Sequence, residues 1–137
     1  MTEQTRREVL RIAGVATLGI GALAGCLGGE NDRQVAMTDA LVFDPSTATI
    51  RPGTTVRWYN DGTVPHTVTA YDGRLPAGAA YFASGGFGTE RAARNDVRGG
   101  LVREGETFEH TFEVAGRYEY FCVPHEGSGM TGTVRVG

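Results

Sequence analysis

The feature that most constrains the fold is a set of short segments in which apolar and polar residues alternate one by one. In segment 55–60, Val56 and Trp58 fall on one face and Arg57 falls on the other. Alternation with a period of two is typical of a β-strand that buries one face and exposes the other. The pattern recurs at 66–70, 107–114, 117–122 and 133–136, and we expect the first strands at 35–43 and 47–50.

Turn-forming residues separate these segments. Pro52-Gly53 comes just before segment 55–60, and Ala115-Gly116 lies between segments 107–114 and 117–122. Short strands at regular spacing, with turn signals between them, are typical of a sandwich of two packed sheets. The sequence therefore predicts an all-β, Greek-key β-sandwich, and the length of 137 residues fits one ordinary domain.

The alternation stops between residues 71 and 105. A loop of this length inside a compact domain usually has a function or carries structure of its own. We expect a long central excursion with room for one short helix in the polar, alanine-containing piece 89–96. The spacing of Arg91, Arg94 and Arg98 is close to helical, and we interpret them as a solvated face, with guidance of an acidic partner as the alternative.

The charge balance excludes one class of partner. Every basic residue is Arg, and the net charge is −3. Nucleic-acid binding depends on neutralising phosphates, so we expect no nucleic-acid partner. The absence of Lys indicates either a GC-rich genome or a salt-adapted source.

Residues 1–25 are predicted to be an export signal rather than part of the fold. Arg6 and Arg7 precede an apolar run at 12–25, which is shorter than the roughly 20 residues that a membrane span requires. A positive start, an apolar middle and small residues at the end are typical of a signal peptide. The arginine pair indicates the twin-arginine export route.

The apolar run ends at Leu23-Ala24-Gly25-Cys26, which resembles the lipobox of lipoproteins. Cys26 is therefore the expected site of lipid attachment, which would hold the protein on the outer face of the cytoplasmic membrane. An ordinary signal peptide with an incidental Cys is the alternative. The Gly-rich, polar residues 26–33 are typical of a flexible tether, and the folded domain is expected at 34–137.

Cys122 is the second of two cysteines. A disulfide to Cys26 is the simplest role for two cysteines in an exported protein. Cys26, however, lies at the predicted cleavage site, outside the expected domain. If Cys26 carries a lipid, Cys122 is a lone thiol, and metal ligation would protect it.

Three potential metal ligands share one short loop. Cys122 and His125 are separated by two residues, and His125 and Met130 by four. A thiolate suits Cu(I), an imidazole suits both copper oxidation states, and a thioether is a weak, distant ligand. His66, on the apolar face of segment 66–70, is the expected fourth ligand. These four residues form the ligand set of a blue copper electron-transfer site; zinc would leave Met130 unexplained.

Two parts of the chain resemble plastocyanins. Segment 116–134 resembles their copper loop, and segment 56–68 resembles the strand that carries their first His ligand. With the missing Lys, the lipobox-like motif and the long excursion, the nearest resemblance is to halocyanins, the plastocyanin-like proteins of halophilic archaea. The resemblance implies a cupredoxin-like sandwich of about eight strands that binds one copper ion. It also implies that His125, in an apolar patch with Pro65 and Pro124, is the electron port.

Two positions depart from the plastocyanin pattern. The residue after the first His is often Asn, which ties the two ligand loops together; here it is Thr67, so we expect that bond to be absent or altered. The residue before the ligand Cys is Tyr in plant plastocyanins. Here it is Phe121, which lacks the hydroxyl that a remote docking site would use.

The sequence thus predicts a one-electron carrier, not an enzyme. We expect a monomer that exchanges electrons with redox proteins or membrane respiratory complexes and has no small-molecule substrate. Copper storage or delivery is the alternative function. A copper-enzyme subunit would need a second Cys in the loop or paired His-x-His motifs, and the sequence has neither. We expect His110 to be structural, Met37 to fill the core and Glu126 to be a solvated carboxylate.

Overall fold

The computed structural model describes residues 32–137. The predicted export signal, the lipid attachment at Cys26 and the tether up to residue 31 lie outside the described residues. Strand β2 begins at Asp32, two residues before the position at which we expected the domain to start.

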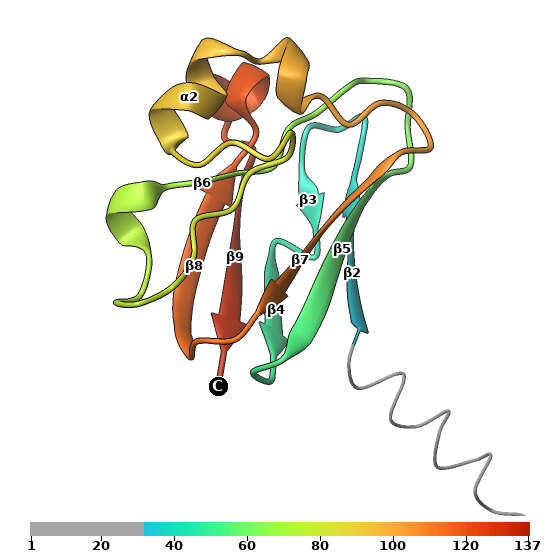
Figure 1. Ribbon diagram of the computed structural model, residues 1–137. Coiled ribbons are helices and arrows are strands. Elements are labelled where there is room, and N and C mark those ends of the chain that lie inside the picture. Colours follow the sequence, from blue (N-terminus) through green and yellow to red (C-terminus); the bar gives the residue numbers. More distant parts are fainter. Residues whose placement is uncertain (1–31) are drawn as a thin grey trace, which may run out of the picture. The chain divides into compact units, whose positions relative to one another are not determined.

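Within residues 32–137, eight strands form two four-stranded sheets (Figure 1). The first sheet has the order β3 (Phe43–Asp44), β2 (Asp32–Met37), β5 (Thr54–Asn60) and β7 (Thr107–Phe112). The second has the order β4 (Thr47–Ile50), β9 (Thr131–Val136), β8 (Gly116–Phe121) and β6 (Thr69–Ala70). The prediction of an all-β sandwich of about eight strands is confirmed.

The first strands of the described chain contribute to both sheets. β2 pairs with β5 in parallel, so that Val35 lies opposite Trp58. β4 pairs with β9 in parallel in the other sheet, while the remaining strand pairs are antiparallel. The chain therefore crosses between the sheets within its first described residues, which closes the sandwich around one core.

The period-two alternation is visible in the burial of each strand. In β5, Val56 and Trp58 are fully buried, whereas Arg57 is exposed. The Trp58 ring meets the Tyr120 ring of the opposite sheet edge-on, with 5.2 Å between the centroids. Edge-to-face aromatic contacts of this kind stabilise a core beyond the area that they bury. Met37 is also fully buried, as expected.

Two expected strands are shorter than the alternation suggested. Segment 35–43 is interrupted by a turn in which the Thr38 N–H donates to the Val42 carbonyl and Leu41 takes a φ of 63°. The Thr38 hydroxyl accepts from the Ala40 N–H, a local bond that competes with strand pairing. Segment 66–70 is regular only in β6, because the backbone of His66 pairs with Val102 instead.

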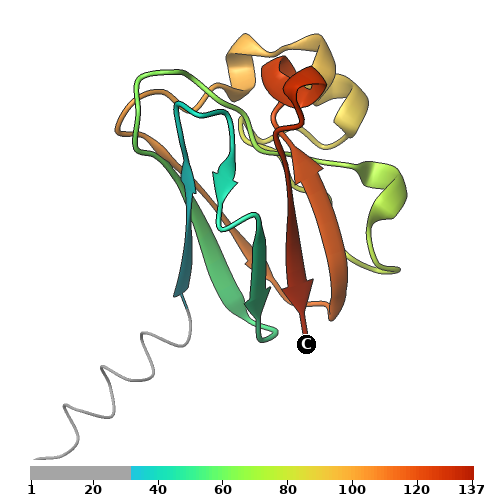
Figure 2. The same cartoon turned by 180° about the vertical axis from the view of Figure 1, so that it is seen from behind.

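The central excursion carries most of the helical turns. It contains η1 (Asp72–Arg74), α2 (Glu90–Asn95) and η2 (Arg98–Gly100). The predicted short helix is present as α2, and the Thr89 hydroxyl caps it by accepting from the Ala92 N–H at 3.1 Å. α2 and η2 lie beside η3 (Val123–Ser128) at one end of the sandwich (Figures 1 and 2). No helix among residues 32–137 is long and apolar enough to span a membrane.

Candidate copper site

Three of the predicted ligands meet at the end of the sandwich. The ligand atoms of His66, Cys122 and His125 all lie within 4.8 Å of one another. The Cys122 Sγ is 3.2 Å from the His125 Nδ1 and 3.8 Å from the His66 Nδ1. His66 and Cys122 are fully buried, and His125 is half-buried. Residues 56 positions apart in the sequence therefore form one cluster of a thiol and two imidazoles.

Met130, the fourth predicted ligand, is brought back to Cys122 by the backbone of the loop. The Cys122 N–H donates to the Met130 carbonyl at 3.0 Å, and the Met130 N–H donates to the His125 carbonyl at 3.2 Å. Gly129 ends η3 with a φ of 87°, a conformation that favours glycine and turns the chain back. Met130 is fully buried in the same apolar cluster as Cys122.

The loop before His66 is fixed by a side chain that the sequence analysis did not single out. The amide of Asn60 donates to the carbonyls of Val64 and Val102, at 2.8 and 3.0 Å. The His66 N–H then donates to the Val102 carbonyl, and the Val102 N–H donates back to the His66 carbonyl at 2.6 Å. The one signal in the sequence is that Asn60, a polar residue, falls on the buried face of its strand.

Thr67 joins the two ligand segments. Its N–H donates to the Cys122 Sγ at 3.3 Å, and its hydroxyl accepts from the Val123 N–H at 2.8 Å. The bond that we expected to be absent or altered is thus present in an altered form, with a hydroxyl as the acceptor. An N–H directed at sulfur stabilises the thiolate, which is the form that binds a metal.

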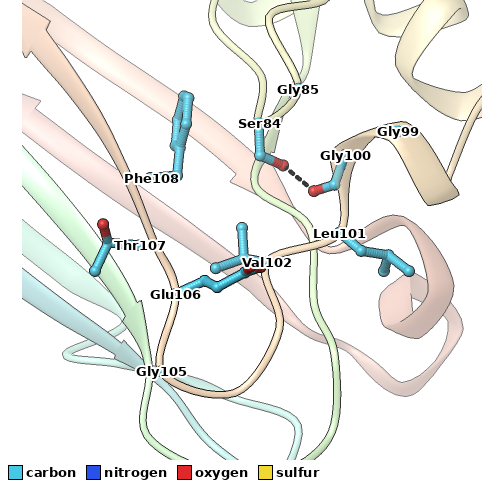
Figure 3. A pocket seen from close by; sticks show the side chains of 10 residues that line it. All are labelled: Ser84, Gly85, Gly99, Gly100, Leu101, Val102, Gly105, Glu106, Thr107 and Phe108. Carbon is cyan, nitrogen blue, oxygen red and sulfur yellow. Dashed lines mark hydrogen bonds between the residues drawn. The ribbon is translucent and has the colours of Figure 1, made fainter.

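Ser84, in the central excursion, supports the strand that follows His66. Its hydroxyl accepts from the Val68 N–H at 2.9 Å and donates to the Gly100 carbonyl at 2.6 Å, the bond drawn in Figure 3. The hollow in Figure 3 is lined by this serine and by residues of η2 and β7, and none of the four predicted ligands lines it. The excursion therefore supports the site indirectly, through hydrogen bonds from Ser84 to the backbone that follows His66.

Burial favours the neutral forms of both His66 and Cys122. Burial, together with the nearby charge of His125, lowers the pKa of His66, so its imidazole is neutral near pH 7. Burial raises the pKa of the Cys122 thiol, although N–H groups of Thr67 and His125 act in the opposite direction. A metal ion that binds here must therefore displace the thiol proton, and it receives one anionic and two neutral ligands in return.

Glu126 is not the solvated carboxylate that we expected. Arg94 donates to both of its oxygens, at 2.8 and 3.2 Å, and the Tyr71 hydroxyl donates to it at 2.8 Å. Arg94 first, and then Tyr71, lower the pKa of Glu126. Arg91, Arg94 and Arg98 are all exposed, as expected for a solvated face, but Arg94 also pairs with Glu90 and Glu126.

Other predicted residues lie around the cluster. Pro65, which precedes His66, is half-buried, and Pro124, which precedes His125, is exposed. His110 lies outside the cluster and stacks on Phe82, with 4.8 Å between the ring centroids.

The comparisons with known proteins agree with this geometry. The profile of the family described as "Copper binding proteins, plastocyanin/azurin family" matches residues 30–137. The chloroplast plastocyanin of Tetradesmus obliquus is 35% identical over 130 residues, which cover 95% of this chain and 81% of that protein. The plastocyanin of Scenedesmus fuscus is 39% identical over 101 residues, which cover 74% and 92%.

Solved structures show the same fold. The novel purple cupredoxin from Nitrosopumilus maritimus has a TM-score of 0.56 and 27% identity, over 77% of this chain and all of that one. The oxidised plastocyanin from Dryopteris crassirhizoma has a TM-score of 0.55 at 24% identity, over 76% of this chain and 99% of that one, which supports the fold alone. With His66, Cys122, His125 and Met130 arranged as a type 1 copper site, this chain belongs to the plastocyanin/azurin family of copper-binding proteins.

Proposed function

We propose that the protein is a one-electron carrier and not an enzyme. The observation that supports this most directly is the cluster of one buried thiol and two imidazoles, already assembled within 4.8 Å. Copper, when bound, supplies the Cu(I)/Cu(II) couple. The donor set suits an ion that changes oxidation state and stays bound, since thiolate and thioether favour Cu(I) while imidazole serves both states.

The chain itself limits how much the site rearranges. His66 is held by its two backbone bonds to Val102, and Cys122 is held by Thr67 and Met130. Because these bonds are made by the protein, the donors do not depend on the metal for their positions. A cage that is fixed in this way changes little between oxidation states, which favours fast electron transfer.

We propose His125 as the electron port. Among the four ligand residues it is the one that is not fully buried. Pro124, next to it in the chain, is exposed, and Pro65, next to His66, is half-buried, so these two prolines could supply an apolar rim for docking. A redox partner that docks on this rim would come within one side chain of the metal.

We also propose that the protein is halocyanin-like and lipid-anchored through Cys26 on the outer face of the cytoplasmic membrane. Its partners would be redox proteins or membrane respiratory complexes, and it would act as a monomer. The support is the twin-arginine and lipobox-like sequence at the N-terminus. A single acyl chain anchors weakly, so we expect a lipid with more than one chain. Mass spectrometry of the exported protein would show the lipid, and Cys26→Ala should abolish it and release the protein from membranes.

The copper proposal is tested by adding Cu(II) to the purified mature protein. We expect an intense blue colour that bleaches with a mild reductant. Cys122→Ser should abolish the colour, whereas His110→Gln, which changes a histidine outside the cluster, should retain it. A colourless complex that yields copper to a mild chelator would contradict the carrier and indicate storage or delivery.

A further inference from the structure

A connected group of side chains joins helix α2 to the loop that carries His125. Arg94 on α2 donates to both oxygens of Glu126, the residue after His125. The same guanidinium donates to Glu90 at 2.8 Å, and the Tyr71 hydroxyl donates to Glu126 at 2.8 Å. A guanidinium that binds both oxygens of a carboxylate fixes its orientation as well as its distance. The central excursion thus holds Glu126 through two of its residues, Arg94 and Tyr71.

The same two residues of the excursion also cover the other end of the loop. The Arg94 guanidinium lies 4.3 Å from the centroid of the Phe121 ring, and Tyr71 stacks on that ring at 4.4 Å with an interplanar angle of 27°. Phe121 is itself fully buried. Arg94 and Tyr71 therefore contact both the residue that precedes Cys122 and the residue that follows His125.

We infer that the central excursion is a clamp on the copper loop and that Arg94 is its positioning residue. Arg94 has two effects: it restrains the loop between Cys122 and Met130, and it compensates the negative charge of Glu126 beside His125. The inference rests on the proposed copper site, but its subject is the loop, which can be measured without metal.

The charge effect follows from where Glu126 lies. Its side chain is 33% exposed and that of Arg94 is 37% exposed, so water screens the pair only in part. Without Arg94, an uncompensated carboxylate would lie next to a ligand residue. A nearby negative charge stabilises the more positive oxidation state of a metal, so the reduction potential would fall.

The first experiment measures the loop in the metal-free protein by hydrogen exchange. In the Arg94→Gln variant we expect the amides of His125, Gly129 and Met130 to exchange about tenfold faster than in the wild type. Arg91→Gln is the matched control, because Arg91 lies on the same helix and is exposed, with no ion pair to another described residue. It should leave these amides unchanged.

The second experiment measures the reduction potential of the copper-loaded variants. We expect the potential to fall in Arg94→Gln, to rise in Glu126→Gln and to return close to the wild-type value in the double variant. Arg94→Lys keeps the charge and loses the two-oxygen contact. Arg94→Lys should therefore keep the wild-type reduction potential, while its loop amides exchange as fast as those of Arg94→Gln. This difference separates charge compensation from positioning.

Two results would overturn the clamp. One is loop exchange in Arg94→Gln equal to that in Arg91→Gln; the other is a reduction potential of Arg94→Gln that is no lower than that of the wild type. If copper gives no blue colour even in the wild type, the proposed function fails. The exchange comparison still decides whether the excursion restrains the loop.

Discussion

Replacing Thr67 by Val tests whether the protein itself holds the two ligand segments together. Valine has nearly the same shape as threonine but cannot accept the Val123 N–H, which now lies 2.8 Å from the Thr67 hydroxyl. Thr67 is 2% exposed, so the side chain itself should still pack. An N–H that loses its only partner costs about 1–3 kcal/mol when it is buried.

Because Val123 is half-buried, we expect a loss near the lower end, about 1–2 kcal/mol of the free energy of unfolding. Urea unfolding of the metal-free protein measures it, with an unchanged dependence on urea concentration. The copper-loaded variant should also bind its metal more weakly, by up to about tenfold, since about 1.4 kcal/mol corresponds to a tenfold change in an equilibrium constant.

The matched control is Thr69→Val. Thr69 is 1% exposed, and its hydroxyl makes one long bond, at 3.4 Å, to the Thr67 hydroxyl. This change removes the same chemical group at similar burial without leaving a backbone donor unpaired, so we expect a loss of about 0.5 kcal/mol or less. Equal losses in the two variants would refute the view that the Thr67 hydroxyl supports the site through Val123.

Three further predictions concern proton release, core packing and a surface ion pair. Because burial raises the pKa of Cys122 and lowers that of His66, the thiol is protonated and the imidazole neutral near pH 7, so copper binding should release about one proton and tighten about tenfold per pH unit. Titration at several pH values checks this, and a flat profile would contradict it. Trp58→Ala should cost about 3–5 kcal/mol in urea unfolding, because a fully buried ring is removed. Arg57→Gln, which breaks an ion pair between side chains about half exposed, should cost at most about 1 kcal/mol.

Much of the fold could be predicted from the sequence because strand alternation is a local property. The alternation of Val56, Arg57 and Trp58 follows directly from the geometry of one strand, and α2 lies within the piece 89–96 in which a short helix was expected. The whole of segment 66–70 was predicted to be one strand, because alternation does not reveal which backbone a residue pairs with. There the partner of His66 is Val102, which lies far away in the excursion where the pattern stops.

The donors of the site could be predicted for a different reason. Three of them lie in one loop, and the chemistry of thiolate, imidazole and thioether identifies copper without knowledge of any long-range contact. The environment of Glu126 could not be predicted in this way, because its partner Arg94 is 32 residues away and was assigned to a solvated face. Charged side chains show their partners only when the fold brings them together.

The supports of the three clustered ligands are all made by the protein itself. His66 is held through Val102, Cys122 through Thr67 and Met130, and the loop of His125 through its own backbone bond to the Cys122 carbonyl at 3.1 Å. Because none of these bonds involves a metal, the three ligand residues should stay close together in the metal-free protein. A site built in this way is ready before copper arrives, so the binding energy is not spent on folding the loop.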